Sequence, residues 1–208
     1  MIRPTLTLLA LLLSAAAAAQ PGALDRLRAL QANPAASKAA AEQGRQAAFF
    51  CVNCHGEDGN SQIPEVPSLA GQNPAYLIEQ MRKFGAGERR DPFMQGLIKV
   101  LKDEERAQIA LYYAAGRPQA NKANATLAAQ GRSRFEKSCA TCHGPRGRGN
   151  DAELIPRIAG QKPAYLESSI TRYRNRSGER NDPRMTAVTA NLAKDEIVAL
   201  ANYLASLD

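Results

Sequence analysis

The chain contains the same pattern twice, and this internal repeat limits its fold more than any other feature. Residues 51–56 read CVNCHG, and residues 139–144 read CATCHG. Residues 67–77 (PSLAGQNPAYL) return as residues 156–166 (PRIAGQKPAYL), and a later G-E-R…D-P-x-M segment also occurs in both copies. The offset between the copies grows from 88 to 91 residues, which indicates small loop insertions in the second copy. Two homologous halves of roughly 80 residues each therefore follow one another along the chain.

Each half is expected to be mostly helical. One helix should approach each cysteine motif, at about residues 37–50 and 127–138. A second should begin at Pro74 and Pro163, because proline suits the first helical turn, and a last one near Asp103 and Asp195. A further short helix is expected at residues 23–31, where leucine recurs every third residue. Neither half shows the alternation of a strand, so the sequence predicts an all-α fold.

The first twenty residues have the pattern of a secretory signal peptide. Arg3 precedes an apolar stretch, and the alanine run at residues 15–19 offers cleavage after Ala19. A retained membrane anchor is the alternative, but the apolar residues 6–19 are few for a membrane span. We therefore expect export to the periplasm. The expected division is a signal peptide at 1–19, an extension at 20–37, domain 1 at 38–115, a linker at 116–125 and domain 2 at 126–208.

The two CxxCH motifs have the spacing of c-type haem attachment sites. Cys51 and Cys54, like Cys139 and Cys142, would project from one side of a helical turn, so that both thiols reach one porphyrin. His55 and His143 then follow at once and can place a nitrogen on the iron. The sequence contains four cysteines and two histidines, and all of them lie in these motifs. We therefore expect two covalently bound haems c.

Two other interpretations of the cysteines compete with haem attachment. A zinc site made from both CxxC pairs would leave the position of each histidine unexplained, and would join pairs 88 residues apart in separate repeats. A disulfide or redox dithiol is compatible with export, but a thioredoxin-like CxxC belongs in a βαβ context that this sequence does not predict.

The second axial ligand of each iron should be a methionine. Met94 and Met185 occupy equivalent repeat positions, each two residues after an Asp-Pro pair, where a proline-containing loop could present the thioether to the iron. Met81 lies within an expected helix and its repeat counterpart is Ile170, which favours packing in the core. A lysine or water ligand remains open but is not required by the pattern.

With these motifs the chain resembles the di-haem cytochrome c4 family, over about residues 40–208. The resemblance implies two tandem class I cytochrome c domains, each a few helices around a haem, with His55 and Met94 on one iron and His143 and Met185 on the other. It also implies that the carbonyls of Pro67 and Pro156 orient the histidines, and that Leu69 and Ile158 pack on the haems.

The resemblance further implies a contact between the first and last helices of each domain. In the second half Gly131 and Phe135 would meet Tyr203. The first half departs from this pattern, because Gly44 lies seven residues before Cys51, whereas Gly131 lies eight before Cys139.

A haem with both axial positions filled suits outer-sphere electron transfer and disfavours intrinsic catalysis. We therefore expect an electron carrier and no enzyme. The resemblance implies a soluble shuttle from a quinol-oxidising complex to a terminal oxidase. The alternative is the electron-accepting cytochrome subunit of a periplasmic dehydrogenase, for example in sulfur oxidation, or of an oxidase complex.

The charge is concentrated in the second half. The whole chain has a net charge of +7, residues 38–118 balance 10 basic against 10 acidic residues, and residues 119–208 carry 14 against 9. The basic residues near the expected haem loops are Arg146, Arg148, Arg157, Arg172, Arg174, Arg176, Arg180 and Arg184. They predict a steering patch for an acidic redox partner. A solvated basic face with arginines on haem propionates is the alternative. Nucleic acid is not expected for an exported protein, and peripheral association with a membrane remains open.

Overall fold

The computed structural model of the protein describes residues 21–119 and 121–208, so the predicted signal peptide at residues 1–19 lies outside the described part. Over these two ranges the regular structure is helical, apart from one antiparallel bridge between Asn150 and Ile155. The prediction of an all-α fold is confirmed. None of the helices in the described ranges is both long and apolar enough to cross a membrane.

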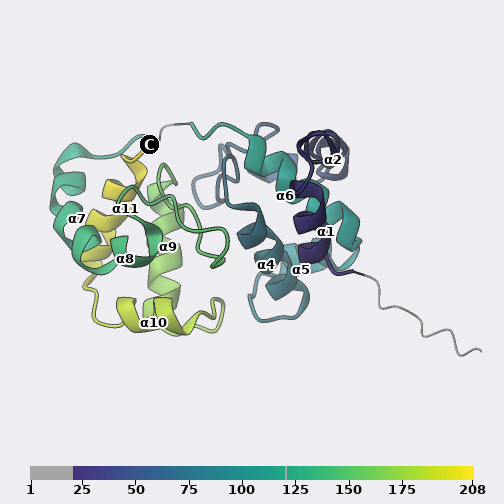
Figure 1. The fold of residues 1–208 in the computed structure, drawn as a ribbon. Coiled ribbons are helices and arrows are strands. Elements are labelled where there is room, and N and C mark those ends of the chain that lie inside the picture. Colours follow the sequence, from purple (N-terminus) through teal and green to yellow (C-terminus); the bar gives the residue numbers. More distant parts are fainter. Residues whose placement is uncertain (1–20, 120) are drawn as a thin grey trace, which may run out of the picture.

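The helices fall into two groups that follow the sequence repeat (Figure 1). The first half holds α1 (Ala23–Gln31), α2 (Pro34–Ala47), α3 (Val52–His55), α4 (Pro74–Gly85), α5 (Pro92–Lys99) and α6 (Asp103–Ala115). The second half holds α7 (Ala125–Ser138), α8 (Ala140–His143), α9 (Pro163–Arg174), α10 (Pro183–Thr189) and α11 (Lys194–Ala205). The segment between α6 and α7 connects the two groups. The division of the chain into domains, with a linker at residues 116–125, stays a prediction.

Most helices begin where the sequence predicts. Helix α1 has the expected bounds, and Pro74 and Pro163 open α4 and α9 as predicted. Helix α2 begins at Pro34, three residues earlier than expected, because the Asn33 side chain accepts hydrogen bonds from the free backbone N–H groups of Ala35 and Ala36 at 3.0 and 3.2 Å.

Helix α1 belongs to the core of the first half. It packs against α2, α4 and α6, and its Leu27 is fully buried in the cluster that these helices form. Burying one leucine contributes about 1.5–3 kcal/mol, so this short helix has a clear reason to stay docked. The second half has no counterpart of α1 among its described helices.

The first and last long helices cross closely in both halves, α2 on α6 and α7 on α11. A Cβ atom on Gly44 would lie 2.1 Å from the Gln108 carbonyl oxygen, and one on Gly131 would lie 2.2 Å from that of Ala199. Both glycines therefore permit the same backbone contact. The one-residue difference in spacing to the cysteine motif is absorbed after the glycine, because α2 ends at Ala47 and a turn precedes Cys51, whereas α7 continues to Ser138.

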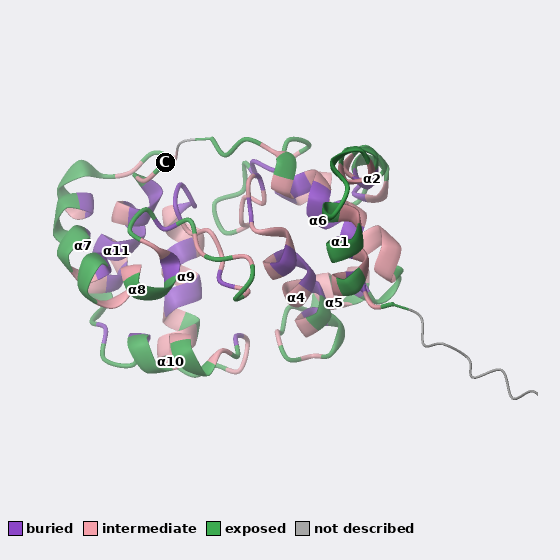
Figure 2. Ribbon diagram, viewed as in Figure 1, coloured by how far each residue is buried: buried purple, intermediate pink, exposed green. Residues whose placement is uncertain are grey.

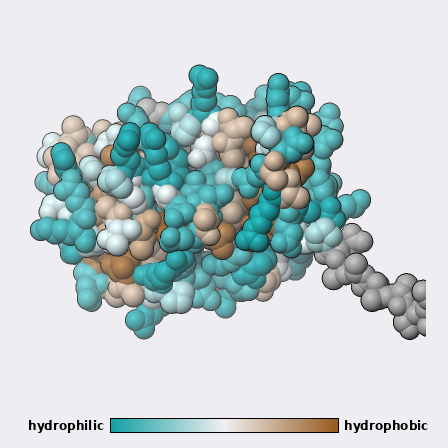
Figure 3. Space-filling view, in the orientation of Figure 1, coloured by the Kyte–Doolittle hydropathy of each residue, from teal (hydrophilic) through white to brown (hydrophobic). Residues whose placement is uncertain are grey.

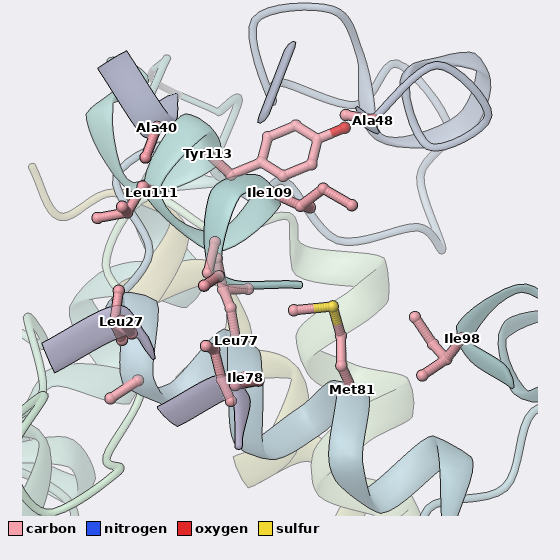
Figure 4. Close-up of a cluster of buried hydrophobic side chains, with 14 of the residues drawn as sticks. Leu27, Ala40, Ala48, Leu77, Ile78, Met81, Ile98, Ile109, Leu111 and Tyr113 are labelled. Carbon is pink, nitrogen blue, oxygen red and sulfur yellow. The ribbon is translucent and has the colours of Figure 1, made fainter. Parts of the chain in front are cut away.

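The two cores fill the same space with different side chains. Phe135 is fully buried, and its ring lies 5.3 Å from that of Tyr203, as predicted. The repeat counterpart of Phe135 is the small Ala48, and Tyr113 in α6 fills the neighbouring volume where the second half has Leu204. A large residue on the last helix thus replaces a large residue on the first, which keeps the packing dense. Figure 2 shows the buried inner faces of the helices, and Figure 4 shows Tyr113 in the first-half cluster.

Candidate haem sites

Each CxxCH motif forms a single helical turn. Cys51 precedes α3 and Cys139 precedes α8, and the His55 and His143 backbone N–H groups donate to the carbonyls of these cysteines at 2.9 and 3.0 Å. The turn places both thiols and the imidazole of one motif on neighbouring positions of one short element. This is the local geometry that the sequence predicts for attachment to one porphyrin.

The two histidine rings are held in the same way. His55 Nδ1 lies 2.9 Å from the Pro67 carbonyl oxygen, and His143 Nδ1 lies 3.1 Å from that of Pro156. A carbonyl oxygen only accepts, so Nδ1 carries the proton and donates it in both rings. Nε2 is therefore left with its lone pair, as iron ligation requires. The predicted role of the two prolines is confirmed in this geometry.

Burial favours the neutral form of both imidazoles. It lowers the pKa of His55 below its usual value, although the bond to the Pro67 carbonyl acts in the opposite direction, and nearby Arg89 and Lys162 lower it further. Burial also lowers the pKa of His143, with a smaller contribution from Arg184. A neutral imidazole is the form that binds a metal.

The predicted methionine ligands lie on short helices, where the sequence analysis placed loops. Met94 is in the first turn of α5, and Met185 in the first turn of α10. In each Asp-Pro pair the aspartate is the N-cap and the proline is the first helical residue, so this dipeptide was the signal for a helix start. Asp91 accepts a hydrogen bond from the Met94 N–H at 3.0 Å, which fixes the backbone of the methionine.

Met81 packs in the first-half core, as its helical position predicted. It is buried on α4 together with Ile98 and Ile109, and Figure 4 shows its sulfur among these apolar side chains. Its counterpart Ile170 is buried in the second-half core. Met81 and Met94 both reach the cavity beside His55, so the choice of ligand between them remains a prediction.

A cavity of about 320 Å³ lies beside the first cysteine motif. Cys51, Cys54, His55 and Met94 line it, with Leu69 and apolar residues of α4 and α6, and Ile158 and Arg157 reach it from the second half. The residues fit a haem: thiols and an imidazole on one side, a thioether, and mostly apolar walls. Within the described residues, Tyr113 Oη and Arg157 Nε on these walls are buried with no hydrogen-bond partner, and both can donate to carboxylates such as those of a haem.

The competing interpretations of the cysteines find no support in the described residues. All four cysteines are free thiols. No group of three or more histidine, cysteine, aspartate or glutamate side chains in the described ranges is arranged to bind a metal ion, as a zinc site would need. Burial raises the pKa of Cys139 to about 11 and also raises that of Cys51, whereas a redox dithiol needs a lowered thiol pKa.

One member of the predicted basic patch is not on the surface. Arg180 is 6% exposed, and it donates to the Tyr165 hydroxyl and, at 3.0 Å, to the Ser169 hydroxyl. Its repeat counterpart Arg89 reaches the same Tyr165 hydroxyl from the first half at 3.3 Å. The two guanidinium groups lower the pKa of Tyr165, although burial acts to raise it. Arg180 is covered because the halves meet here, which the sequence pattern did not reveal.

Other arginines of that set remain exposed. Figure 3 shows hydrophilic residues over most of the face in view. Among the predicted patch residues, the exposed ones are Arg146, Arg148, Arg172, Arg176 and Arg184. Arg172 and Arg184 are paired with Glu179 and Asp182. The second half therefore presents basic side chains to solvent, with Arg180 removed from the predicted set.

Two glutamines of the repeated A-G-Q segments, for which the sequence pattern predicted no role, connect the halves. Gln72 donates to the Arg157 carbonyl and accepts from the Arg157 N–H, both at 2.8 Å. Gln161 does the same with Ser68, donating to its carbonyl at 2.9 Å and accepting from its N–H at 3.0 Å. The two pairs are repeat equivalents, so the contact has the symmetry of the sequence repeat. Recurrence of A-G-Q in both copies was the available signal.

The surrounding contacts repeat this symmetry. Asn73 donates to the Ile155 carbonyl at 2.7 Å, and its counterpart Lys162 donates to the Val66 carbonyl at 3.2 Å. Val66 and Ile155 immediately precede the two prolines that hold the histidines. The contact between the halves is therefore built on the backbone segments that position the candidate iron ligands.

Comparison with known proteins gives consistent results. The sequence model of the cytochrome c family matches residues 128–208. The chain is 34% identical to cytochrome c4 of Pseudomonas aeruginosa, over 83% of this chain and 90% of that protein. It is 32% identical to a thiosulfate dehydrogenase electron acceptor of Stutzerimonas stutzeri, over 89% and 93% of the two chains.

A solved structure agrees with these relatives. The crystal structure of reduced cytochrome c4 from Pseudomonas stutzeri superposes with a TM-score of 0.75 at 33% identity, and the match covers 81% of this chain and 98% of that one. Both halves, with their two CxxCH turns, are thus part of one shared architecture. The chain belongs to the cytochrome c4 family, and it is a di-haem c electron carrier and not an enzyme.

Proposed function

We propose that each haem is attached and ligated by the residues of its own half. Cys51 and Cys54 would hold one haem, and His55 and Met94 would be the two protein ligands of its iron. In the second half the same roles fall to Cys139, Cys142, His143 and Met185. The observation that carries this assignment is the pair of Nδ1–H bonds to Pro67 and Pro156, which leaves Nε2 of both histidines available.

This ligand set suits the transfer of single electrons. The haem supplies a one-electron iron couple, and a thioether ligand favours the reduced iron and raises its potential. The protein contributes buried imidazoles in fixed orientations and, beside His55, mostly apolar cavity walls. With a histidine and a methionine holding each iron, its ligation would change little between the two oxidation states.

Redox-titrated visible spectroscopy tests the ligand set. We expect two haems by mass spectrometry and a thioether-to-iron charge-transfer band. Met94→Leu and Met185→Leu should each lower one potential and allow small ligands to bind that iron, because leucine cannot ligate. Met81→Leu is the matched control and should leave both potentials in place. If Met81→Leu opens the first iron and Met94→Leu does not, the ligand assignment for the first half is wrong.

We propose further that the protein works in the periplasm as a shuttle between a quinol-oxidising complex and a terminal oxidase. The signal-peptide pattern of residues 1–19 supports the location. The exposed arginines of the second half support an acidic docking surface on a partner. Residues 38–115 and 126–208 would be the two haem domains, with residues 20–37 an extension of the first.

A second candidate function is that of an electron-accepting subunit of a periplasmic dehydrogenase. The relative from Stutzerimonas stutzeri that is a thiosulfate dehydrogenase electron acceptor favours it, because it matches nearly the whole chain. Affinity purification of the protein from its own periplasm separates the two. A stable complex with a larger dehydrogenase that survives high salt supports the subunit. Recovery of the protein without a bound dehydrogenase, together with an electron-exchange rate that falls as salt rises, supports the shuttle.

A further inference from the structure

We propose that Gln161 and Gln72 are positioning residues that act across the molecule, each on the iron-ligating histidine of the other half. The inference rests on the proposed function, since it takes His55 and His143 as the iron ligands. Its consequence is that part of the reduction potential of each haem is set by a side chain in the half that does not hold it.

The argument starts from one peptide group. The Pro67 carbonyl and the Ser68 N–H belong to the same peptide unit, on opposite sides of it. The carbonyl accepts the hydrogen bond from His55 Nδ1 at 2.9 Å, while the N–H donates to Gln161 Oε1 at 3.0 Å. The three groups therefore form a continuous chain, from the glutamine amide through one peptide unit to the imidazole.

The second half contains the equivalent chain of hydrogen bonds, with the roles of the two halves exchanged. The Pro156 carbonyl accepts from His143 Nδ1 at 3.1 Å, and the Arg157 N–H of the same peptide unit donates to Gln72 Oε1 at 2.8 Å. The duplication matters because the two hydrogen-bond chains come from segments about 90 residues apart. Each of them crosses from one half to the other. An accidental contact would not be reproduced at the equivalent positions of both repeats.

Each glutamine is fixed in the orientation that this role needs. Gln161 Oε1 also accepts the Lys162 backbone N–H at 3.1 Å, and Gln72 Oε1 accepts that of Asn73 at 2.9 Å. The amide nitrogens donate to the Ser68 and Arg157 carbonyls, so the oxygen and nitrogen positions cannot be exchanged. Both glutamine side chains are buried, where hydrogen bonds are electrostatically stronger than in water.

Hydrogen bonds in a chain polarise one another. A glutamine oxygen that accepts from the peptide N–H raises the negative partial charge on the carbonyl of the same peptide. The Nδ1–H bond to that carbonyl then strengthens, which makes the imidazole a more basic ligand. A more basic ligand stabilises oxidised iron over reduced iron. The glutamine of one half is therefore expected to lower the potential of the haem in the other half.

Methionine substitution removes the amide and keeps the length of the side chain. Gln161→Met should raise the potential of the haem ligated by His55, and Gln72→Met should raise that of the haem ligated by His143. We expect a shift of roughly threefold to tenfold in the reduction equilibrium of the crossed haem, about 30–60 mV for one electron. The haem in the substituted half should move less. Spectroelectrochemical titration gives the two potentials, and NMR signals of the ligand histidines assign each to its half.

Two control variants separate this relay from a general disturbance of the interface. Ser68→Ala keeps the backbone groups that Gln161 contacts, so both potentials should stay in place. Asp151→Ala removes a hydrogen bond of 2.8 Å from the Ala75 N–H to the Asp151 carboxylate, which also joins the halves but does not reach a proline carbonyl. It removes one negative charge as well, so any effect should raise both potentials together and not follow the crossed pattern.

Larger shifts in the substituted half, or equal shifts in both, would overturn the relay and leave the haem ligation intact. Failure to find two His-ligated haems would instead contradict the proposed function. If neither glutamine variant takes up haem, amide hydrogen exchange and NMR of the wild-type protein test the proposal instead. The Ser68 and Arg157 amide protons should exchange slowly with solvent and change chemical shift on reduction; fast exchange of both means that the chain is not formed.

Discussion

The two halves build the same haem-binding framework but surround it with different surfaces. In the first half Phe50, Phe93 and Val100 are 66, 64 and 78% exposed and line the cavity beside His55. At the equivalent repeat positions the second half has Ser138, Arg184 and Asn191. The cysteines, histidines and prolines of the haem-binding motifs are the same in both halves. The exposed residues just named, which form the rim of the site, change from apolar to polar and basic. The comparison teaches that the site and the surface around it vary independently.

The interior shows the same separation of what is kept from what varies. The glycines at the helix crossings and the histidine–proline bonds occur in both halves. The large buried side chain is Phe135 on the first helix of the second half, but Tyr113 on the last helix of the first half. Among the described helices, α1 has no counterpart in the second half. Backbone contacts leave no freedom of residue type, whereas side-chain volume can be supplied from either helix.

The largest expected effect is on the shared helix crossing. Gly131→Ala or Gly44→Ala would place a Cβ about 2 Å from a carbonyl oxygen, so the helices must separate. We expect a loss of about 3 kcal/mol of unfolding free energy for either variant, measured by urea denaturation of the haem-containing protein. Gly96→Ala in α5 is the control, because nothing lies within 4 Å of its added Cβ, and it should be neutral or slightly stabilising. A small effect at only one crossing would break the equivalence of the two halves.

An intermediate effect is expected on the difference between the rims. Arg146→Gln combined with Arg184→Gln removes two exposed positive charges from the second half. At low salt the electron-transfer rate with a negatively charged reagent should fall by up to about tenfold, and its dependence on salt should become flatter. Lys38→Gln combined with Arg45→Gln removes the same charge from an exposed part of the first half. An equal effect of this control pair would show that net charge matters and the basic rim does not.

The smallest effect concerns the start of the last helix. Glu196 accepts from the Ala193 N–H at 2.9 Å and pairs with Arg134. Its counterpart Glu105 accepts the equivalent bond from the Lys102 N–H at 2.8 Å, and has no arginine partner in the part of the chain that the structure describes. The Ala193 N–H and then Arg134 lower the pKa of Glu196 below its usual value. A carboxylate with a lowered folded-state pKa stabilises the fold above its unfolded pKa, and this contribution is lost as the pH falls through the folded value.

Arg134→Gln should therefore reduce stability slightly at pH 7 and weaken its fall in acid. Thermal melts between pH 3 and 7 measure this. Arg106→Gln in the first half is the matched control, since Arg106 pairs with Asp103 and not with the capping glutamate. An unchanged acid dependence in Arg134→Gln would remove the electrostatic difference between the two helix starts.

Much of the site could be predicted because its chemistry is local. Cysteines three residues apart with a following histidine fit one helical turn, whatever surrounds them. Proline and aspartate likewise mark helix starts, although the sequence prediction for the Asp-Pro pairs before Met94 and Met185 is a loop. That error arose because an N-cap aspartate and a loop aspartate look alike in short segments.

The contacts between the halves could not be predicted in the same way. Arg180 is buried, and Gln161 bonds to Ser68. Both features depend on residues that lie far apart in the sequence. A polar residue in a loop has the same local pattern whether it faces solvent or another domain. Only the docking of one half on the other decides which of these residues lose their water, and therefore which must find protein partners.

The sequence by itself determined the two-fold repeat, the helical class, the haem attachment motifs and the family, because each follows from residue types at short, fixed spacings. Tertiary structure alone decided how the two haem sites are connected. Hydrogen bonds across the interface depend on the relative position of the two halves, and no spacing along the chain encodes that position directly.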